Sequence, residues 1–325
     1  MAKQYFADAS RARIQITAAQ ARSIRDMYSD LAVEIAAENK RLSSRSNISS
    51  ILRKQYLDTL SAQIKSELDN INRIQNTTIR QNMASVASAI VTDNTLLLQT
   101  LGINVTGAYS FIPTDIVKEI ASGKLYEGRW TLNSAIWSNT TKTKRDIDYI
   151  VAKGIAGQKS TLEIAQDLEK YVNPAKRLDW KWSKVYPGSS RVVDYNAQRL
   201  ARTMISHAYQ DSLVRSTRDN PFVECYRWLT SNSDRVCDIC IERSEGFHGV
   251  VINGKPMEGC YYASDIPLDH PNGMCTVETV IESDFNAIGN RLADWVNGKN
   301  DPALDNFAVS MGYGPRYVKS KVTSG

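Results

Sequence analysis

The first hundred residues carry a helical pattern of apolar positions. Neither proline nor glycine occurs between residues 8 and 98, and apolar side chains recur there at spacings of three and four. This spacing predicts one buried face of an α-helix. The first stripe is Ile24, Tyr28, Leu31 and Ile35, and the second is Leu57, Leu60, Ile64, Leu68 and Ile71, continuing toward Val86 and Ile90. The polar stretch 41–50 separates them, so we predict two long helices joined by a short turn.

These two helices define a predicted N-terminal helical arm over residues 1–100. Its polar face is rich in Ser, Asn and Gln, and strict heptads do not continue for the three or four repeats that a coiled coil requires. Isolated helices are marginal in water without tertiary burial. We therefore expect the apolar stripes to pack against the rest of the chain or against a larger assembly.

A helical middle domain is predicted for residues 101–218. Gly and Pro return together at 101–115, which indicates a linker, and helices are predicted at 114–123 and 160–172. Ser160 and Glu163 have the capping-box spacing, and Pro174 ends the second helix. Residues 178–191 look irregular. A further helix at 194–217 is predicted to bury Leu200, Met204, Ala208 and Leu213.

Strand signals begin only after Pro221. The alternating residues 222–230 and the β-branched run 275–282 predict strands, and Asn253-Gly254 is typical of a two-residue hairpin turn. Residues 284–298 predict a helix closed by Gly298, followed by a loose basic tail at 301–325. The chain is thus predicted to be mainly α, with a small α+β C-terminal module at 219–300.

The composition places the chain among ordinary globular proteins. Of its 325 residues, 42% are hydrophobic and 23% charged, and this length allows two domains or one domain with an arm. No run of about 18 uncharged apolar residues occurs, so we expect no membrane span. The N-terminus lacks the apolar stretch of a secretory signal, which predicts a chain made in the cytoplasm and kept in a reducing compartment.

The charge distribution is mild and gives little information about partners. The net charge is +5, and residues 1–100 hold 13 Lys and Arg against 9 Asp and Glu. Binding to phosphate backbones needs several clustered cations, and no dense basic patch occurs. The charge is compatible with nearby nucleic acid, but a solvated helical face explains it equally well.

The cysteines carry the most specific chemical signal. All five lie between residues 225 and 275, and an odd number favours metal binding or free thiols over a disulfide framework. Cys237 and Cys240 form a CxxC motif, and His270 and Cys275 follow after 29 residues. Three thiols and one imidazole match a tetrahedral zinc site, and four protein ligands leave no position open for chemistry. We predict a structural zinc that staples the β-hairpin module.

Other interpretations of this region remain open. The CxxC cysteines could be incidental, and Cys260 or His248, inside the intervening loop, could replace one proposed ligand. Cys225 is expected in the core. The stretch 249–255 matches the start of a phosphate-binding loop, but Pro256 stands where a Mg-binding hydroxyl is needed, so a hairpin is favoured over a nucleotide site.

Catalytic alternatives find less support in the sequence. Asp269 and His270 resemble the Asp-His step of a His-Asn-His nuclease, in which they would serve metal and water chemistry, but the later Asn and His are missing. His207 lies on a predicted helix without an acidic or nucleophilic partner at fixed spacing, which favours a structural role. We therefore predict no catalytic residues and no small-molecule substrate, with a metal-dependent nuclease or a zinc-containing DNA-binding module as the alternatives.

Several segments resemble, in order, the tailed-phage minor head (head morphogenesis) proteins related to protein F of phage Mu. They are "TLNSAIWSNT", "IVAKGIAGQKSTLEIAQDL", "AQRLARTMISHAYQDS", "YRWLTSNSDRVCDIC" and "PLDHPNGMC". Each motif is loose, and their order makes the resemblance persuasive over about residues 125–285. Two positions depart from the family pattern: Met204 stands where the family has Glu, and Gly273 replaces the first of two closing cysteines.

The resemblance implies a role in the virion. It assigns the same four Cys and His residues as metal ligands, and it gives no support to the first hundred residues. It further implies a component present in few copies at the portal vertex or the capsid interior. Such a protein would bind the portal and the capsid or scaffold proteins and would assist head assembly, genome packaging or genome delivery. Contact with packaged DNA is left open.

Overall fold

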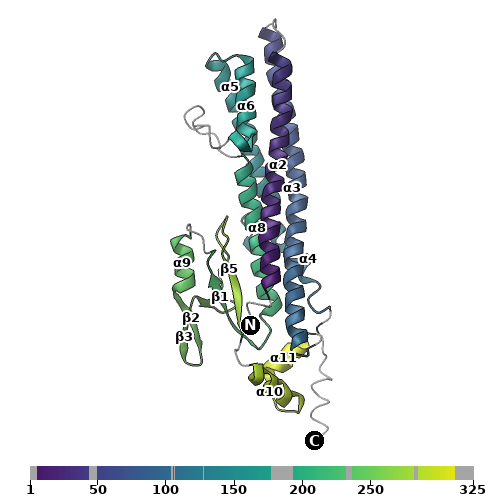
Figure 1. The fold of residues 1–325 in the computed structure, drawn as a ribbon, viewed down its shortest axis with the longest axis vertical. Coiled ribbons are helices and arrows are strands. Elements are labelled where there is room, and N and C mark those ends of the chain that lie inside the picture. The colour runs from purple at the N-terminus through teal and green to yellow at the C-terminus, as the bar shows by residue number, and fades with distance from the viewer. Residues whose placement is uncertain are drawn as a thin grey trace. The chain divides into compact units, whose positions relative to one another are not determined.

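The computed structural model describes residues 6–43, 50–103, 105, 107–126, 128–176, 193–231, 236–281 and 285–311. The fold is mainly helical with a small C-terminal sheet, as predicted (Figure 1). The helices are α2 (Ala7–Ser43), α3 (Ser50–Thr100), α4 (Ile112–Ser122), α5 (Leu132–Ala156), α6 (Thr161–Val172), α8 (Val193–Thr217), α9 (Asp238–Glu245), α10 (Phe285–Val296) and α11 (Pro302–Ser310). Short 3-10 turns occupy Lys124–Tyr126 and Pro174–Lys176.

The chain forms two compact units, each made of separate stretches. Unit 1 contains Met1–Ile16, Asn82–Glu119 and Thr203–Gly325, and unit 2 contains Thr17–Gln81 and Ile120–Arg202. Helices α2, α3, α4 and α8 therefore contribute residues to both units. The predicted division into consecutive domains at residues 100, 218 and 300 describes the order of elements along the chain and stays a prediction.

Unit 2 buries the apolar stripes that the sequence predicted. Ile24, Tyr28, Leu31, Ile35, Leu57, Leu60, Ile64, Leu68 and Ile71 are all buried. Helices α5 and α6 approach closely, because Gly154 leaves room for the side chain of Ile164. The predicted capping box at the start of α6 is present: Glu163 N donates to Ser160 Oγ at 3.2 Å, and Ser160 N donates to Glu163 Oε2 at 2.7 Å.

Unit 1 holds the strands. The antiparallel sheet has the order β4-β1-β5, formed by Cys260–Tyr261, Val223–Leu229 and Thr276–Ile281, and a separate hairpin pairs β2 (Phe247–Ile252) with β3 (Lys255–Glu258). The largest hydrophobic core cluster of unit 1 combines residues that are distant in sequence: Phe6, Ala9, Val86, Ile90, Leu97, Ile205, Tyr209, Leu213, Trp228, Cys240, Tyr261, Cys275 and Val277. The first turns of α2, the end of α3 and α8 thus complete a core that the strands alone would lack.

The C-terminal elements agree with the predictions in part. Asn253 and Gly254 have φ values of 51° and 75°, which fits the predicted hairpin turn, and the following strand β3 excludes a phosphate-binding loop at this place. Gly298 follows α10 with φ 95°, as predicted. The prediction of a loose tail at 301–325 was wrong at its start, because Pro302–Ser310 form α11. The first turn of α11 is capped, since Leu304 N donates to Asp301 Oδ1 at 3.2 Å.

Some predictions fall on stretches without a description. The irregular segment 178–191, residues 44–49 of the polar turn and residues 312–325 of the tail lie outside the described residues. Among the helices in the described part of the chain, none combines the length and the apolar character that crossing a membrane requires.

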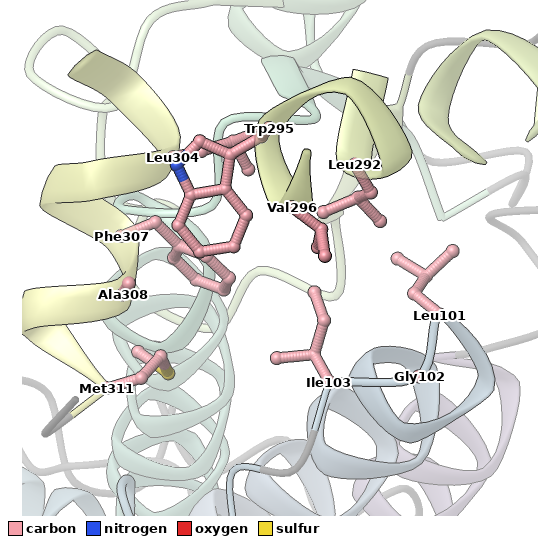
Figure 2. Close-up of a pocket in the computed structure, with 10 residues that line it drawn as sticks. All are labelled: Leu101, Gly102, Ile103, Leu292, Trp295, Val296, Leu304, Phe307, Ala308 and Met311. Atoms are coloured by element: carbon pink, nitrogen blue, oxygen red, sulfur yellow. The ribbon is translucent and has the colours of Figure 1, made fainter. Parts of the chain in front are cut away.

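A small apolar cavity lies in unit 1 among the end of α3, α10 and α11 (Figure 2). Its volume is about 200 Å³, and its lining is Leu101, Gly102, Ile103, Leu292, Trp295, Val296, Leu304, Phe307, Ala308 and Met311. The indole N–H of Trp295 donates to Asp305 Oδ1 at 2.8 Å. Ligand sites usually combine apolar walls with a few converging polar groups, so this lining alone indicates no chemistry.

Candidate metal centre

The CxxC motif sits at the start of the short helix α9. Cys237 is the N-cap residue, and its carbonyl accepts hydrogen bonds from Cys240 N at 2.9 Å and Ile241 N at 3.1 Å. The nearby backbone N–H of Cys240 lowers the pKa of the Cys237 thiol, and His270 lowers it further. A helix N-terminus favours a thiolate in this way, and a thiolate is the form that binds metal.

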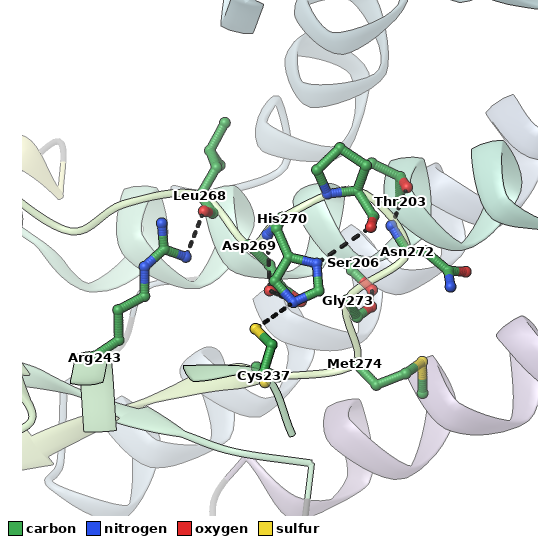
Figure 3. A network of polar contacts seen from close by, with 12 residues as sticks. Thr203, Ser206, Cys237, Arg243, Leu268, Asp269, His270, Asn272, Gly273 and Met274 are labelled. Atoms are coloured by element: carbon green, nitrogen blue, oxygen red, sulfur yellow. Dashed lines mark hydrogen bonds and ion pairs between the residues drawn. The ribbon is translucent and has the colours of Figure 1, made fainter. Parts of the chain in front are cut away.

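The second half of the cluster is the turn at residues 268–275 (Figure 3). Asp269 Oδ1 accepts from His270 N at 2.8 Å, and His270 O accepts from Gly273 N at 2.9 Å. Asn272 adopts φ 71°, a left-handed conformation that asparagine tolerates better than most residues. These local bonds fix a tight turn that presents His270 and Cys275 to the CxxC motif.

A polar stripe on α8 anchors this turn through its backbone. Asn272 N donates to Thr203 Oγ1 at 2.9 Å, Ser206 Oγ donates to Gly273 O at 3.4 Å, and His207 Nε2 donates to Asp269 O at 2.9 Å. Gln210 Nε2 donates to Pro267 O, and Gln210 Oε1 accepts from Asp269 N. Thr203, Ser206, His207 and Gln210 are all buried. Their spacing of three, four and seven places them on one helix face.

His207 is buried on this stripe and bonded to a backbone carbonyl, and its structural role stays a prediction. Burial lowers its pKa, and the hydrogen bond to the Asp269 carbonyl acts in the opposite direction. The stripe as a whole was missed in the sequence, although its i, i+3, i+4, i+7 spacing on a predicted helix was available as a signal.

The four predicted ligands come together in two overlapping groups. Ligand atoms of Cys237, Cys240 and His270 lie within 4.8 Å of one another, and so do those of Cys240, Asp269 and Cys275. Cys237 Sγ and His270 Nε2 are 3.4 Å apart. Sulfur at about 2.3 Å and nitrogen at about 2.0 Å from one zinc would be separated by about 3.5 Å at the tetrahedral angle. The cluster could therefore bind a metal ion.

The orientation of His270 also suits a metal ligand. Its Nδ1 donates to the Pro271 carbonyl at 3.2 Å, which leaves the lone pair of Nε2 directed toward Cys237. Metal-binding histidines commonly fix their tautomer by such a bond on the other ring nitrogen. The His270 side chain is 37% exposed, whereas Cys240 and Cys275 are buried, so the cluster lies at the edge of the core.

Two arginines bring positive charge to the buried side of the cluster. Arg13, from α2, is only 3% exposed, and its Nη1 and Nη2 donate to the carbonyls of Cys275 and Met274, both at 3.4 Å. Burial lowers the pKa of Arg13, while Tyr209, Asp269 and Cys275 raise it. Arg243 Nη1 donates to Leu268 O at 3.1 Å. A buried guanidinium needs compensating negative charge, which thiolates and a carboxylate would supply.

The alternative ligands lie elsewhere in unit 1. Cys260 and Cys225 share a separate core cluster with Val250, and within the described residues Cys260 belongs to neither metal-ligand group. Hydrogen bonds from Cys225 and Arg227 lower the pKa of Cys260, and this pairing raises the pKa of Cys225. Cys225 is buried, as predicted.

His248, the other alternative ligand, is engaged by its own neighbours. Its ring stacks on Tyr261 with centroids 4.2 Å apart, and its Nε2 donates to the Arg243 carbonyl at 3.2 Å.

Comparisons with protein-family models, with curated proteins and with solved structures find no match to this chain. The geometry of the described residues therefore carries the functional argument, together with the order of the motifs in the sequence.

Proposed function

We propose that this chain is a minor structural protein of a tailed-phage head that contains one structural zinc ion. The observation that carries the proposal is the order of the segments that resemble the protein F-like family, which ends in the four-residue Cys and His cluster. In this role the protein would bind the portal and the capsid or scaffold proteins inside the head. It would assist assembly and genome packaging or delivery.

The proposed zinc ion acts as a structural clamp. Cys237 and Cys240 would hold it from the start of α9, and His270 and Cys275 from the turn that α8 anchors. The ion would close a loop of 29 residues that contains the β2–β3 hairpin. Because the ligands converge only in the folded chain, the free energy of metal binding would add directly to folding free energy.

The same ligand set argues against catalysis. Structural zinc sites fill their coordination positions with protein groups, whereas catalytic sites keep one position for water or substrate. His270, the residue that the nuclease alternative would need, points its Nε2 at Cys237 and would be occupied as a ligand.

Co-purification with the portal protein encoded by the same genome tests the proposed role. We expect the full chain, co-expressed with that portal protein, to remain bound to it through affinity capture and size-exclusion chromatography. A Cys225→Ser variant should behave like the wild type, because Cys225 lies outside both metal-ligand groups.

Two results would contradict this role. Folded, metal-containing chain that binds neither the portal nor the capsid and scaffold proteins would remove the proposed function. Metal-dependent cleavage of supercoiled DNA, lost in His270→Ala and kept in Cys260→Ser, would favour the nuclease instead.

A further inference from the structure

The carboxyl group of Asp269 is buried beside the cluster with one oxygen unpaired. The Asp269 side chain is only 2% exposed. Its Oδ1 accepts from His270 N at 2.8 Å, whereas its Oδ2 has no hydrogen-bond partner within the described structure. Buried polar atoms almost always have a partner, and a buried ionised carboxylate requires one most strongly. The unpaired Oδ2 of Asp269 therefore requires a binding partner.

The position of this carboxylate coincides with the candidate metal centre. One of its oxygens, Cys240 Sγ and Cys275 Sγ all lie within 4.8 Å of one another, and Cys240 is also shared with Cys237 and His270. A carboxylate oxygen and a thiolate bound to one zinc ion would be separated by about 3.5 Å, so this separation allows a common ion.

The backbone of Gly273 makes room for the carboxylate. A Cβ placed at residue 273 would fall inside the Asp269 carboxylate, closer to its oxygens than any real Cβ contact. Gly273 is held in place by its N–H bond to His270 O and by Ser206 Oγ on its carbonyl. The absence of a side chain at Gly273 thus leaves the space that the Asp269 carboxylate occupies.

The surrounding charges fit an additional anionic ligand. Three thiolates and one carboxylate would carry four negative charges against the two of a divalent ion. The guanidinium groups of Arg13 and Arg243 each attract the Asp269 carboxylate, and Arg13 is buried against the backbone of Met274 and Cys275. The excess negative charge would therefore be compensated from the protein side.

We propose that Asp269 is a fifth ligand of the same ion, which then has three sulfur, one nitrogen and one oxygen donors from the chain. This inference rests on the metal site proposed above and specifies its coordination. Structural zinc sites usually have four ligands, but zinc accepts carboxylate oxygen at about 2.0–2.2 Å and is able to expand to five ligands in catalytic sites. Asp269 would thus bind the ion directly, unlike a residue that only orients another ligand through a hydrogen bond.

Cobalt substitution of the full-length chain tests the coordination number. In Co²⁺-loaded wild type we expect thiolate-to-cobalt charge-transfer bands together with the weak d–d absorption of a five-coordinate ion. Asp269→Asn keeps an acceptor for His270 N but removes the charged donor. It should retain the thiolate bands, gain the stronger d–d absorption of a four-coordinate ion, and bind the metal more weakly than the wild type.

The control and the contradicting outcomes separate this inference from the metal site itself. Asp265→Asn, an exposed carboxyl in the same loop, should match the wild type in both bands and affinity. Strong four-coordinate d–d absorption in the wild type overturns the fifth ligand, even if the Asp269→Asn protein does not fold. Unchanged d–d absorption in a folded Asp269→Asn protein overturns it as well. Absence of any thiolate-to-cobalt band in the wild type removes the metal site and this inference together.

Discussion

Gly273 shows how one missing side chain shapes the candidate metal centre. The space next to its backbone, which a Cβ would occupy, is filled by the carboxylate of Asp269. A residue with a Cβ at position 273 and the present position of Asp269 therefore exclude each other.

Replacing this glycine tests the close packing. Gly273→Ala should lower the free energy of unfolding by roughly 1–3 kcal/mol, because the new methyl group must displace a buried carboxylate. It should also weaken metal binding, since Asp269 and the His270 turn move together. Urea unfolding and chelator competition on the purified chain measure the two effects.

Gly289→Ala is the matched control for this substitution. A Cβ at Gly289 meets no neighbour, and the residue lies within α10. This change should raise the free energy of unfolding by roughly 0.4–1 kcal/mol, as expected for alanine in a helix. Equal effects of the two variants would contradict the packing described for Gly273.

Single residues were predicted from sequence where the signal was local. The CxxC pair and the burial of Cys225 needed only neighbouring residues and residue type. The contacts of Asp269 and Arg13 could not be predicted, because their partners lie up to 262 residues away in sequence. No periodic pattern encodes such a pairing.

At the scale of elements, α9 depends most clearly on the cluster. The helix has only eight residues, its N-cap Cys237 makes no side-chain capping bond, and Cys240 is its one buried residue. So short a helix is not stable by itself in water. We infer that metal binding by the CxxC motif would hold its first turn in place.

Removing the metal should therefore loosen α9 selectively. In hydrogen–deuterium exchange, chelator-treated protein should exchange the amides of α9 and of the 268–275 turn faster than metal-loaded protein. The amides of α5 and α6, which belong to unit 2, should be unchanged and serve as the internal control. Uniform acceleration along the chain, or no change in α9, would argue against a local structural role for the metal.

Element prediction succeeded where a start or stop signal coincided with apolar periodicity. The long helices α2, α3 and α8, the capping box of α6 and the Asn253-Gly254 hairpin combine both signals. Helix α5 was not predicted, although it has 25 residues and the N-cap Thr131. Helix α11 was missed although Asp301 and Pro302 form a good helix start, because residues 301–325 were treated as one loose tail. Helix α9 was missed because eight residues are too few for a periodic signal.

At the scale of the whole molecule, the two compact units do not follow the order of the chain. Residues from both ends of the predicted arm belong to unit 1. The largest core cluster of unit 1 combines residues from Phe6 to Val277 along the sequence. Pattern analysis identifies a buried face but not the element that covers it. The C-terminal module therefore has a larger core than its own strands provide, and deletion of residues 1–100 would expose that core.

The central claim is that this chain holds one structural zinc ion through its Cys and His cluster, and metal analysis of the purified full-length chain tests it most directly. Freshly purified, reduced wild type and Cys225→Ser should each contain about one zinc per chain. Cys240→Ser should contain little, because Cys240 is shared by both ligand groups. Wild type without zinc, or Cys240→Ser with the zinc content of wild type, would contradict the account.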